Sequence, residues 1–529
     1  MSLLLRANAI RAIEQRAQAA GANLMERAGR AAADAARAML ANAPHHPARV
    51  LVLAGPGNNG GDAFEAAVHL KAWGHEVTLC FEGAPERLPP DAARAYAKWR
   101  AAGSGCHQAL PAPHEFDLIV DGLFGIGLTR AIAPPYLDWI NNVNATSVAV
   151  LALDVPSGLD ADTGRVMGAA IRATRTLSFI ADKPGLHTLH GPDHAGQIDI
   201  DTLELRESPS SAVAQTAVAD YGQPVADGGE LVTRSTFADL LAPRTRNVHK
   251  GSFGTLGILG GASGMAGAAL LAGRAALKLG AGKILVGLLD GRGPAVDLMQ
   301  PELMLRAARD LDLAQCAALV AGPGLGMTSA AHAFVTSALA TPVPLLLDAD
   351  ALNLIAADNT LAAAVTQRRA ATLLTPHPQE AARLLAVSTA DVQADRIAAA
   401  CTLAQRFNAH VVLKGAGSVI ASGNAWWINP TGNPGMASAG MGDVLSGLAG
   451  SLLAQNAIAD GAETLGTSGS TNDSAVQALV GAVFLHGAAA DFLVKQGTGP
   501  AGLTASEVID AARALWNEWC AGDANHLRG

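Results

Sequence analysis

The sequence predicts an α/β protein made of two layered domains, because short apolar runs alternate with helix-like stretches along its whole length. In the first half the apolar runs are 50–54, 77–81, 117–120, 148–153 and 176–180, with helix-like stretches such as 62–73 and 91–102 between them. In the second half the apolar runs are 254–259, 283–288, 318–320, 344–347, 372–374 and 411–413. Such alternation is typical of βαβ units in a mostly parallel sheet.

Length and composition support this fold class. The chain has 529 residues, which predicts about two to four domains. Half of the residues are hydrophobic and only 4% are aromatic, a mix that favours tightly packed α/β layers over aromatic-rich β-sandwiches. The stretch 206–229 is rich in Ser, Ala, Pro and Gly and lacks periodicity, so we predict a linker there between domains at 1–205 and 230–529. A similar stretch at 458–475 predicts a surface loop.

Charge and cysteine usage narrow the class of protein. The net charge is −9 and no dense run of Lys or Arg occurs, which argues against nucleic acid as a partner. Five cysteines are scattered without a CxxC pair, so neither a zinc site nor a disulfide framework is predicted. No apolar run approaches the roughly 18 residues that span a bilayer, and the N-terminal apolar stretch is too short for a signal peptide. We therefore expect a cytoplasmic protein without a membrane partner, whose many small residues fit a homo-oligomer.

The stretch "AGPGNNGGD" at 54–62 directly follows the first apolar run. A strand that ends in a glycine-rich turn and opens a helix offers backbone amides to an anion, and the helix dipole favours negative charge there. Glycines let the backbone approach a phosphate without a Cβ in the way. The pattern predicts a phosphorylated ligand, with a tight turn that needs glycine for a positive φ as the alternative.

Three further segments surround this turn: "NLMERAG" (23–29), "VDGLFGIGLTR" (120–130) and "LDVPSGLDADTG" (153–164). In order and spacing they resemble the NAD(P)H-hydrate epimerases over most of residues 20–200. The resemblance implies a Rossmann-like three-layer αβα domain with Asp154 as the catalytic residue, although a turn-capping aspartate is an equal reading of that residue alone. It also implies substrate contacts at Asn58, Asn59, Gly60, Gly61, Asp62, Gly125, Ile126, Gly127, Leu128, Thr129, Arg130, Ala131, Tyr136 and Asp154.

Asn59, Asp121 and Ser157 offer only oxygen ligands and follow three different predicted strands. Hard, oxygen-only coordination suits an alkali or alkaline-earth ion better than zinc. In the epimerase family that ion is potassium, so the resemblance implies a potassium site at these three residues.

The stretch "NPGMASAGMGDVLSG" at 433–447 is the strongest signal in the second half. Asp443 stands at a glycine turn that leads into a helix, which resembles the GxGD signature of ribokinase-like small-molecule kinases. There the helix N-terminus forms an anion hole for the transferring phosphoryl group, and the aspartate acts as base towards the acceptor hydroxyl. A capping aspartate is the alternative.

Further segments indicate which branch of that superfamily the second half resembles. "GGASGMAGAALLAGRAALKLGAG" (260–282), "AGPGLG" (321–326), "DADALN" (348–353), "TPHPQE" (375–380) and "LKGAGS" (413–418) follow one another in order. Together they look like the ADP/ATP-dependent NAD(P)H-hydrate dehydratases over about 230–520, which implies a ribokinase-like α/β domain that uses Mg²⁺ with ADP or ATP. The implied substrate contacts are Ala266, Gly324, Gly326, His377 and the catalytic Asp443, and the implied nucleotide contacts are Lys414, Gly415, Ala416, Gly417, Ser418 and Gly442.

The two resemblances combine into one hypothesis, a two-domain enzyme that repairs hydrated NAD(P)H. The first half would interconvert the R and S hydrates, and the second would phosphorylate the hydroxyl of the S form so that it leaves as phosphate. Two alternatives stay open: a kinase of a vitamin-like or sugar hydroxyl with a regulatory first half, and a non-catalytic binding module in the first half. The choice between ADP and ATP also stays open.

A few positions depart from the family patterns or have an uncertain role. Ala63 stands where glycine is expected, Glu65 places an acid near the phosphate cradle, and Gln379 replaces a glycine after His377. Either Glu65 points away from the cradle or epimerase affinity is altered. Lys183 matches the family pattern but is typical of a solvated surface charge, and Asp348 and Asp350 are interpreted as metal-linked residues or strand-end caps.

Overall fold

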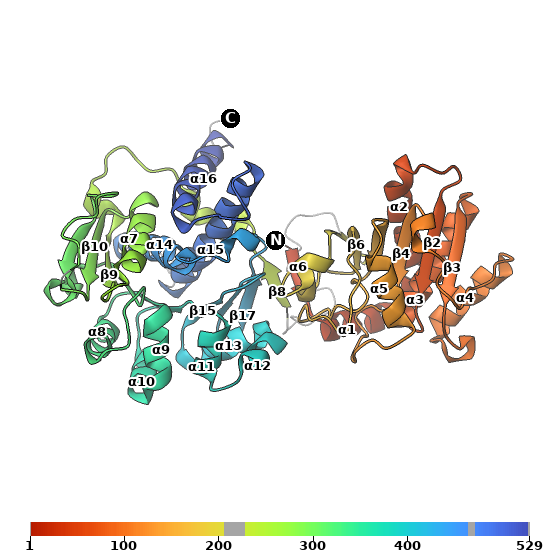
Figure 1. Cartoon of the computed structure of the whole chain (residues 1–529), viewed down its shortest axis with the longest axis horizontal. Helices are drawn as coiled ribbons and strands as arrows, with labels where there is room; N and C mark the ends of the chain where they lie inside the picture. Colours follow the sequence, from red (N-terminus) through yellow and green to blue (C-terminus); the bar gives the residue numbers. More distant parts are fainter. Residues whose placement is uncertain (1, 206–227, 292, 464–470, 527–529) are drawn as a thin grey trace. The chain divides into compact units, whose positions relative to one another are not determined.

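The computed structural model describes residues 2–205, 228–291, 293–463 and 471–526, and it divides into two compact units, Ser2–Glu230 and Leu231–Gly529 (Figure 1). Most of the predicted linker, 206–227, lies outside the described residues. Two short strands, β1 (Ser2–Leu5) and β8 (Gly228–Leu231), lie near the ends of the first unit.

The first unit is built on a parallel sheet with the strand order β3-β2-β4-β5-β6-β7. Its strands are β2 (Arg49–Ala54), β3 (Glu76–Phe81), β4 (Leu118–Gly122), β5 (Ala149–Leu153), β6 (Arg175–Phe179) and β7 (Gln197–Asp201). Its helices are α1 (Ala7–Ala19), α2 (Leu24–Met39), α3 (Asn58–Ala72), α4 (Pro90–Ala101), α5 (Tyr136–Asn144) and α6 (Gly191–His194).

Both faces of this sheet are covered, because successive side chains of a strand point to opposite faces. Val50 and Val52 of β2 pack in one apolar cluster with α1 to α4, whereas Leu51 and Leu53 pack in another with α5. The register pairs Leu53 with Asp121 and Asp121 with Ala152. The segments that follow β2, β4 and β5 therefore meet at one edge of the sheet, as predicted for an αβα domain.

The second unit contains a larger sheet, in which the order from β17 is β17-β16-β15-β14-β13-β12-β9-β10-β11. Its strands are β9 (Thr255–Gly260), β10 (Lys283–Leu288), β11 (Met304–Ala307), β12 (Ala318–Ala321), β13 (Leu345–Leu347), β14 (Thr372–Leu374), β15 (His410–Leu413), β16 (Val419–Ser422) and β17 (Ala425–Ile428). The pairs from β11 to β15 are parallel, and β15, β16 and β17 pair antiparallel.

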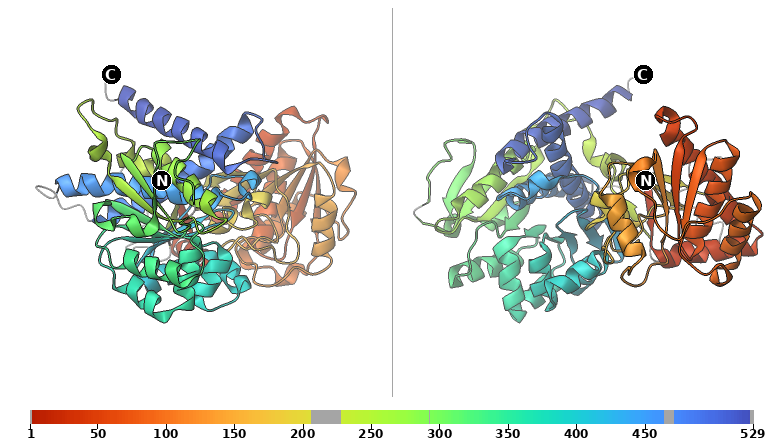
Figure 2. Two further views of the ribbon diagram at one scale, coloured as in Figure 1. Left: turned by 60° about the vertical axis from the view of Figure 1, so that its left-hand side comes forward. Right: turned by 45° about the vertical axis from the view of Figure 1, so that its right-hand side comes forward.

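Helices cover both sides of this sheet (Figure 2). They are α7 (Ala266–Lys278), α8 (Ser329–Leu339), α9 (Ala349–Ala357), α10 (Asn359–Gln367), α11 (Pro378–Leu385), α12 (Thr389–Ala394), α13 (Arg396–Phe407), α14 (Met441–Glu463), α15 (Thr471–Lys495) and α16 (Ala505–His526). The loop predicted at 458–475 is wrong at both ends, because α14 continues to Glu463 and α15 begins at Thr471; residues 464–470 lie outside the described part of the chain.

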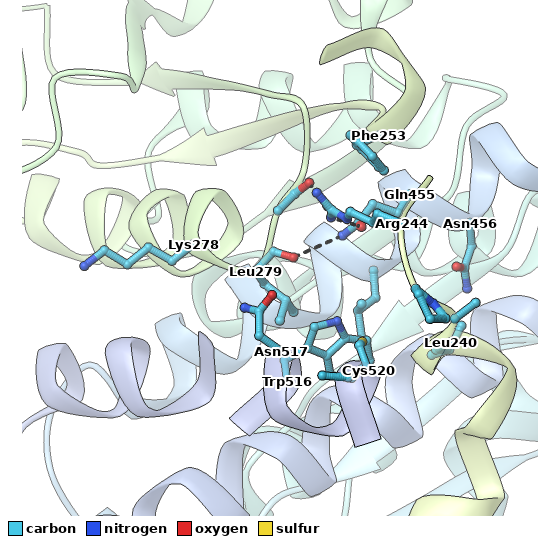
Figure 3. Close-up of a pocket in the computed structure, with 15 residues that line it drawn as sticks. Leu240, Arg244, Phe253, Lys278, Leu279, Gln455, Asn456, Trp516, Asn517 and Cys520 are labelled. Atoms are coloured by element: carbon cyan, nitrogen blue, oxygen red, sulfur yellow. Dashed lines mark hydrogen bonds between the residues drawn. The ribbon is translucent and has the colours of Figure 1, made fainter. Parts of the chain in front are cut away.

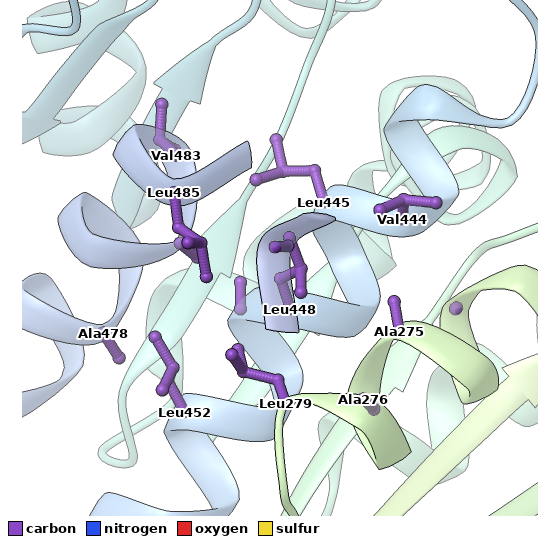
Figure 4. Close-up of a cluster of buried hydrophobic side chains, with 14 of the residues drawn as sticks. Ala275, Ala276, Leu279, Val444, Leu445, Leu448, Leu452, Ala478, Val483 and Leu485 are labelled. Atoms are coloured by element: carbon purple, nitrogen blue, oxygen red, sulfur yellow. The ribbon is translucent and has the colours of Figure 1, made fainter. Parts of the chain in front are cut away.

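The main core of the second unit lies between the sheet and helices α7, α14, α15 and α16. Figure 4 shows Leu448 of α14 between side chains of α7 and α15. A Cβ at Gly447 would lie 2.1 Å from the carbonyl oxygen of Ala272, so the backbones of α14 and α7 touch there. Small residues on both helices allow this close approach. One helix segment within the described residues, Ser474–Lys495, is long and apolar enough to cross a membrane, and 61% of its apolar window is buried inside the protein.

Candidate active sites

The glycine-rich turn of the first unit joins β2 to the start of α3. Gly57 precedes the helix, and no side chain caps it. A Cβ at Gly60 would lie 1.9 Å from the carbonyl oxygen of Gly55, so this turn is too tight for any other residue. The first amides of a helix have no partner within that helix, and the turn therefore supplies the predicted anion cradle around Asn58 and Asn59.

The three predicted potassium ligands gather beside this cradle. The Asp121 carboxylate is fully buried and accepts hydrogen bonds from Ser157, at 2.6 Å from Oγ and 2.8 Å from the backbone N–H. Burial raises the pKa of Asp121 to about 6. Asn59 lies next to Gly122 and Gly125, and its buried side-chain amide has no hydrogen-bond partner among the described residues. A buried amide without a partner is the kind of group that a bound ion would satisfy.

Asp154 directly follows β5 in a left-handed backbone conformation, with φ 68°. Its Oδ1 lies 2.8 Å from the Nζ of Lys183, and its Oδ2 accepts the N–H of Ile126 at 3.0 Å. Lys183 is fully buried and also donates to the Ser178 hydroxyl at 2.8 Å. The prediction of a solvated surface lysine is wrong, because β6 and the turn after it enclose this ammonium group against Asp154.

The loop 125–131 lies over Asp154. A Cβ at Gly125 would come within 2.6 Å of Asp154 Oδ2 and 3.4 Å of Asn59 Oδ1, so only glycine allows this approach. Tyr136, a predicted substrate contact, donates its hydroxyl to the carbonyl of Glu82, and its ring packs edge-on against Phe124. The structure therefore gives the Tyr136 hydroxyl a structural partner.

Glu65 does not disturb the phosphate cradle. Its side chain is 5% exposed and lies 2.7 Å from the Nζ of Lys98, a residue of α4. Its Cβ packs directly against Gly29 of α2. A Cβ added at Gly29 would lie only 2.1 Å from the Glu65 Cβ. Ala63 is fully buried beside Gly122, where a Cβ would lie 2.6 Å from the Ala63 Cβ. Glu65 therefore points away from the cradle, which was one of the two alternatives.

In the second unit, Asp443 lies in the first turn of α14, behind the positive-φ Gly440. Burial and the nearby Asp348 carboxylate raise the pKa of Asp443 to about 6, against the opposing effect of Lys414. A carboxyl with a pKa just below neutral can accept a proton at physiological pH. Asp443 therefore has the position and the ionisation expected of a general base.

Lys414 follows β15 and lies among carboxylates. Its Nζ is 2.8 Å from Oδ1 of the buried Asp348, whose Oδ2 accepts the hydroxyl of Ser446 at 2.7 Å. Asp348, Glu380 and Asp443 raise the pKa of Lys414, although burial opposes them. A Cβ at Gly442 would lie 3.4 Å from Lys414 Nζ, so the glycine turn of α14 directly faces the lysine. Asp348 is thus an ion-pair partner that holds Lys414 in place.

His377 caps α11, and the capping hydrogen bonds hold its side chain in place. Its Nδ1 accepts the backbone N–H groups of Gln379 and Glu380 at 3.1 and 3.2 Å, and the Glu380 carboxylate accepts the His377 N–H at 2.8 Å. Burial and the Lys414 charge lower the pKa of His377. Gln379 is exposed in the first turn of the helix, so its replacement of glycine leaves the turn intact.

The remaining predicted residues lie on loops at the same edge of the sheet. Gly324 and Gly326 have positive φ values of 57° and 77°, and the Gly326 N–H donates to Asp350 at 2.8 Å. Ala266 begins α7. In the nucleotide loop, Gly415 has a φ of 150°, and the Ser418 hydroxyl closes the turn by donating to the Gly415 carbonyl at 3.0 Å. Ala416 and Gly417 lie between them.

Comparison with known proteins places the chain in a family. A family model described as NAD(P)H-hydrate dehydratase matches residues 256–513, and one described as YjeF-related protein N-terminus matches residues 21–185. The bifunctional NAD(P)H-hydrate repair enzyme of Coxiella burnetii is 36% identical over 527 residues, which cover 98% of this chain and 100% of that protein. The chain belongs to this family of bifunctional repair enzymes.

A further relative agrees with this membership. The bifunctional NAD(P)H-hydrate repair enzyme of Escherichia coli is 37% identical over 509 residues, 95% of this chain and 91% of that protein. A solved ADP/ATP-dependent NAD(P)H-hydrate dehydratase from Bacillus subtilis, co-crystallised with ATP and Mg²⁺, is 28% identical with a TM-score of 0.45, and the match covers 55% of this chain and 99% of that one. The predicted family, bifunctional enzyme class and α/β fold are confirmed.

Three residues at the sites of this repair enzyme escaped the sequence motifs. Two of them, Glu14 and Arg11, lie on α1: Arg11 donates to the carbonyl of Ile126, and Glu14 is close enough to Asp154 for the two charges to interact. His486 of α15 is 6% exposed, and its Nε2 has no hydrogen-bond partner among the described residues. Burial and the Lys414 charge lower the pKa of His486 to about 4, so this imidazole is neutral. None of the three stands in a glycine-rich motif, so only their positions in the folded chain reveal them.

A cavity of about 550 Å³ lies elsewhere in the dehydratase-type unit, and Figure 3 shows Arg244, Gln455 and Trp516 among its lining residues. Arg244 donates to the carbonyl of Gly280, just beyond the end of α7. Ala266 stands at the other end of this helix, about 20 Å away at 1.5 Å per residue. The cavity is therefore separate from the candidate dehydratase site.

Proposed function

We propose that residues 1–205 of this chain interconvert R- and S-NAD(P)H hydrate, and that residues 230–529 dehydrate the S form to NAD(P)H with ADP or ATP. One observation carries the proposal: in this member of the family, each unit keeps a carboxylate at the sheet edge close to a lysine ammonium group, Asp154 with Lys183 and Asp443 near Lys414. Ligands of open α/β sheets bind at this edge.

Two further expectations, a cytoplasmic location and a homo-oligomer, stay predictions. Light scattering of the purified chain tests the second.

In the first unit, the cradle at Asn58–Asp62 binds the phosphate region and the loop 125–131 closes over the nicotinamide ring. Asp154 lies under that loop and can exchange a proton with the hydroxyl that leaves and returns on the other face of the ring. Lys183 holds one carboxylate oxygen of Asp154 at 2.8 Å. The other oxygen, held by the Ile126 N–H at 3.0 Å, is on the side of the loop.

In the second unit, Asp443 takes the proton from the substrate hydroxyl as that oxygen accepts the phosphoryl group. The first amides of α14 stabilise the charge that develops on the transferring group. Lys414 and the Gly415–Ser418 turn bind the nucleotide. Mg²⁺ would be bound mostly by the phosphate oxygens of the nucleotide, whose charge it would neutralise.

The potassium site predicts that epimerisation is faster in potassium than in sodium. Asn59, Asp121 and Ser157 offer oxygen atoms with one carboxylate among them, and the partnerless Asn59 amide fits an ion there. Initial epimerase rates in the two salts at equal ionic strength test this. Equal rates in the two salts, or an unchanged potassium preference in a Ser157→Ala variant, would show that these residues do not hold a functional potassium ion.

The dehydration rate is expected to fall as the pH drops through about 6, because Asp443 must be ionised to accept a proton and its pKa is raised to about 6. The measurement is kcat for the S-hydrate between acidic and neutral pH at saturating nucleotide. The protein incubated at low pH and assayed at neutral pH is the control for irreversible inactivation. A kcat independent of pH across this range contradicts Asp443 as the base.

A single experiment tests the overall proposal. The purified full chain is given separated R- and S-hydrates, with ADP and ATP compared, and the return of dihydronicotinamide absorbance is followed. We expect the S-hydrate to react only with nucleotide, and the R-hydrate to react after a lag set by epimerisation. Nucleotide consumption without NAD(P)H formation would instead favour a conventional small-molecule kinase.

A further inference from the structure

Glu14 lies on the buried face of α1, although it carries a charge in solution. The buried residues of this helix are Ala7, Ile10 and Ala17. Residues three or four apart share one face of a helix, so Glu14 falls in the middle of that stripe, between Ile10 and Ala17. The stripe is otherwise apolar, and Glu14 is the one half-buried carboxyl group within it.

The face that carries Glu14 is attached to the epimerase site through one residue of the substrate loop. Arg11, one turn before Glu14, donates from its guanidinium to the carbonyl of Ile126 at 3.0 Å. The N–H of the same Ile126 donates to Asp154 Oδ2 at 3.0 Å. At its start, α1 is fixed by the Ala7 N–H, which donates to Asp162 at 2.7 Å. Glu14 is thereby held close to Asp154.

The charged groups facing Glu14 come from several elements. They are Asp154 after β5, Lys183 after β6, Arg11 on α1 itself and Asp62 on α3. Burial, followed by the Asp154 charge, raises the pKa of Glu14 to about 7, and Lys183 and Arg11 only partly oppose this. Asp154 has its charge stabilised by the Lys183 ion pair. Burial and a neighbouring carboxylate therefore favour the protonated form of Glu14, whereas Asp154 forms an ion pair with Lys183, an arrangement typical of an acid and a base.

We propose that Glu14 is the proton donor of the epimerisation and that Asp154 is the proton acceptor. This step rests on the proposed epimerase function. Hydration of an enamine places the hydroxyl on the carbon next to the ring nitrogen. Glu14 gives its proton to that hydroxyl, the C–O bond breaks, water leaves, and the nitrogen lone pair forms a C=N bond. Water then adds to the other face, its proton passes to Asp154, and exchange with solvent restores both groups.

The test is Glu14→Gln in the full chain, which keeps the size of the side chain and removes the proton. We expect kcat for epimerisation to fall about 10²-fold or more, with KM nearly unchanged. The wild-type rate should fall as the pH rises through about 7, where Glu14 loses its proton, and this decline should be absent from the variant's residual rate. Glu14→Asp should recover part of the rate, because the shorter acid still donates.

Controls separate this role from a structural one. Glu86→Gln changes an exposed glutamate and should leave both activities unchanged. Dehydration of pure S-hydrate by Glu14→Gln reports that the chain is folded, and the thermal midpoint reports the stability of the first unit. A Glu14→Gln variant with wild-type epimerisation, or with a reduced rate but the same alkaline decline, overturns the proposal. A wild-type chain that does not epimerise the hydrates overturns both the proposed function and this step.

Discussion

Replacing Asp443 with asparagine is expected to slow nucleotide-dependent dehydration by about 10²- to 10⁴-fold, the usual cost of removing a general base. Asp443 lies in the first turn of α14, close enough to Asp348 and Lys414 for both to influence its pKa. Asparagine has the same shape but does not accept the proton of the substrate hydroxyl. The measurement is single-turnover dehydration of pure S-hydrate with ADP and with ATP.

The same variant should epimerise at the wild-type rate, because Asp154 belongs to the other unit. Nucleotide binding, followed as the rise in thermal midpoint on adding ADP, should be retained, since Lys414 and the Gly415–Ser418 turn are unchanged. Asp310→Asn, at an exposed aspartate with 64% of its side chain accessible, is the matched control. Wild-type dehydration by Asp443→Asn would refute the assignment of the base.

Replacing Asp154 with asparagine should abolish most epimerisation and also destabilise the first unit. Lys183 is fully buried and loses its carboxylate partner, which lies 2.8 Å away. Removing one partner of a buried ion pair costs about 3–5 kcal/mol, because an uncompensated charge is left inside the protein. Epimerisation should fall by about 10²-fold or more, since the proton acceptor is gone.

A second variant distinguishes the two effects. In Asp154→Asn/Lys183→Met the buried charge is removed along with its partner, so stability should largely return while epimerisation stays lost. Calorimetry of the thermal transitions measures stability, and R-hydrate turnover coupled to dehydration measures epimerisation. Recovery of activity in the double variant, or wild-type epimerisation in Asp154→Asn, would show that Asp154 is not the reacting carboxylate.

The sequence predicted the central parallel strands of each sheet better than the strands near the sheet edges. The apolar runs coincide with β2 to β6 and with β9, β10 and β12 to β15 to within two residues at each end, because buried parallel strands are continuously apolar. The hairpin β16–β17 was missed, although Gly423 and Asn424 form a two-residue turn typical of hairpins between its strands. The preceding "LKGAGS" segment indicates a nucleotide loop and gives no sign of the strand that follows it.

The positions of candidate site residues in the fold could be predicted where they stand in turn motifs, because such motifs fix local backbone geometry. Asp154, Asp443, Lys414 and His377 each lie at a strand end or helix start. Glu14 and the burial of Lys183 could not be predicted in this way. Arg11 and Ile126, whose contact attaches α1 to the site, are separated by 115 positions along the chain. Only the folded arrangement reveals that two ordinary charged residues surround the same carboxylate.

The contact between α7 and α14 has a mechanical consequence for the dehydratase site. Both helices begin at that site, one at Ala266 and the other next to Asp443. Their backbones touch at Ala272 and Gly447, within about two turns of both starts. Asp443, the proposed proton acceptor, and Ala266, the residue predicted to touch the substrate, therefore lie on one rigid pair of helices. Their spacing is set when the chain folds, so substrate binding does not have to bring them into alignment.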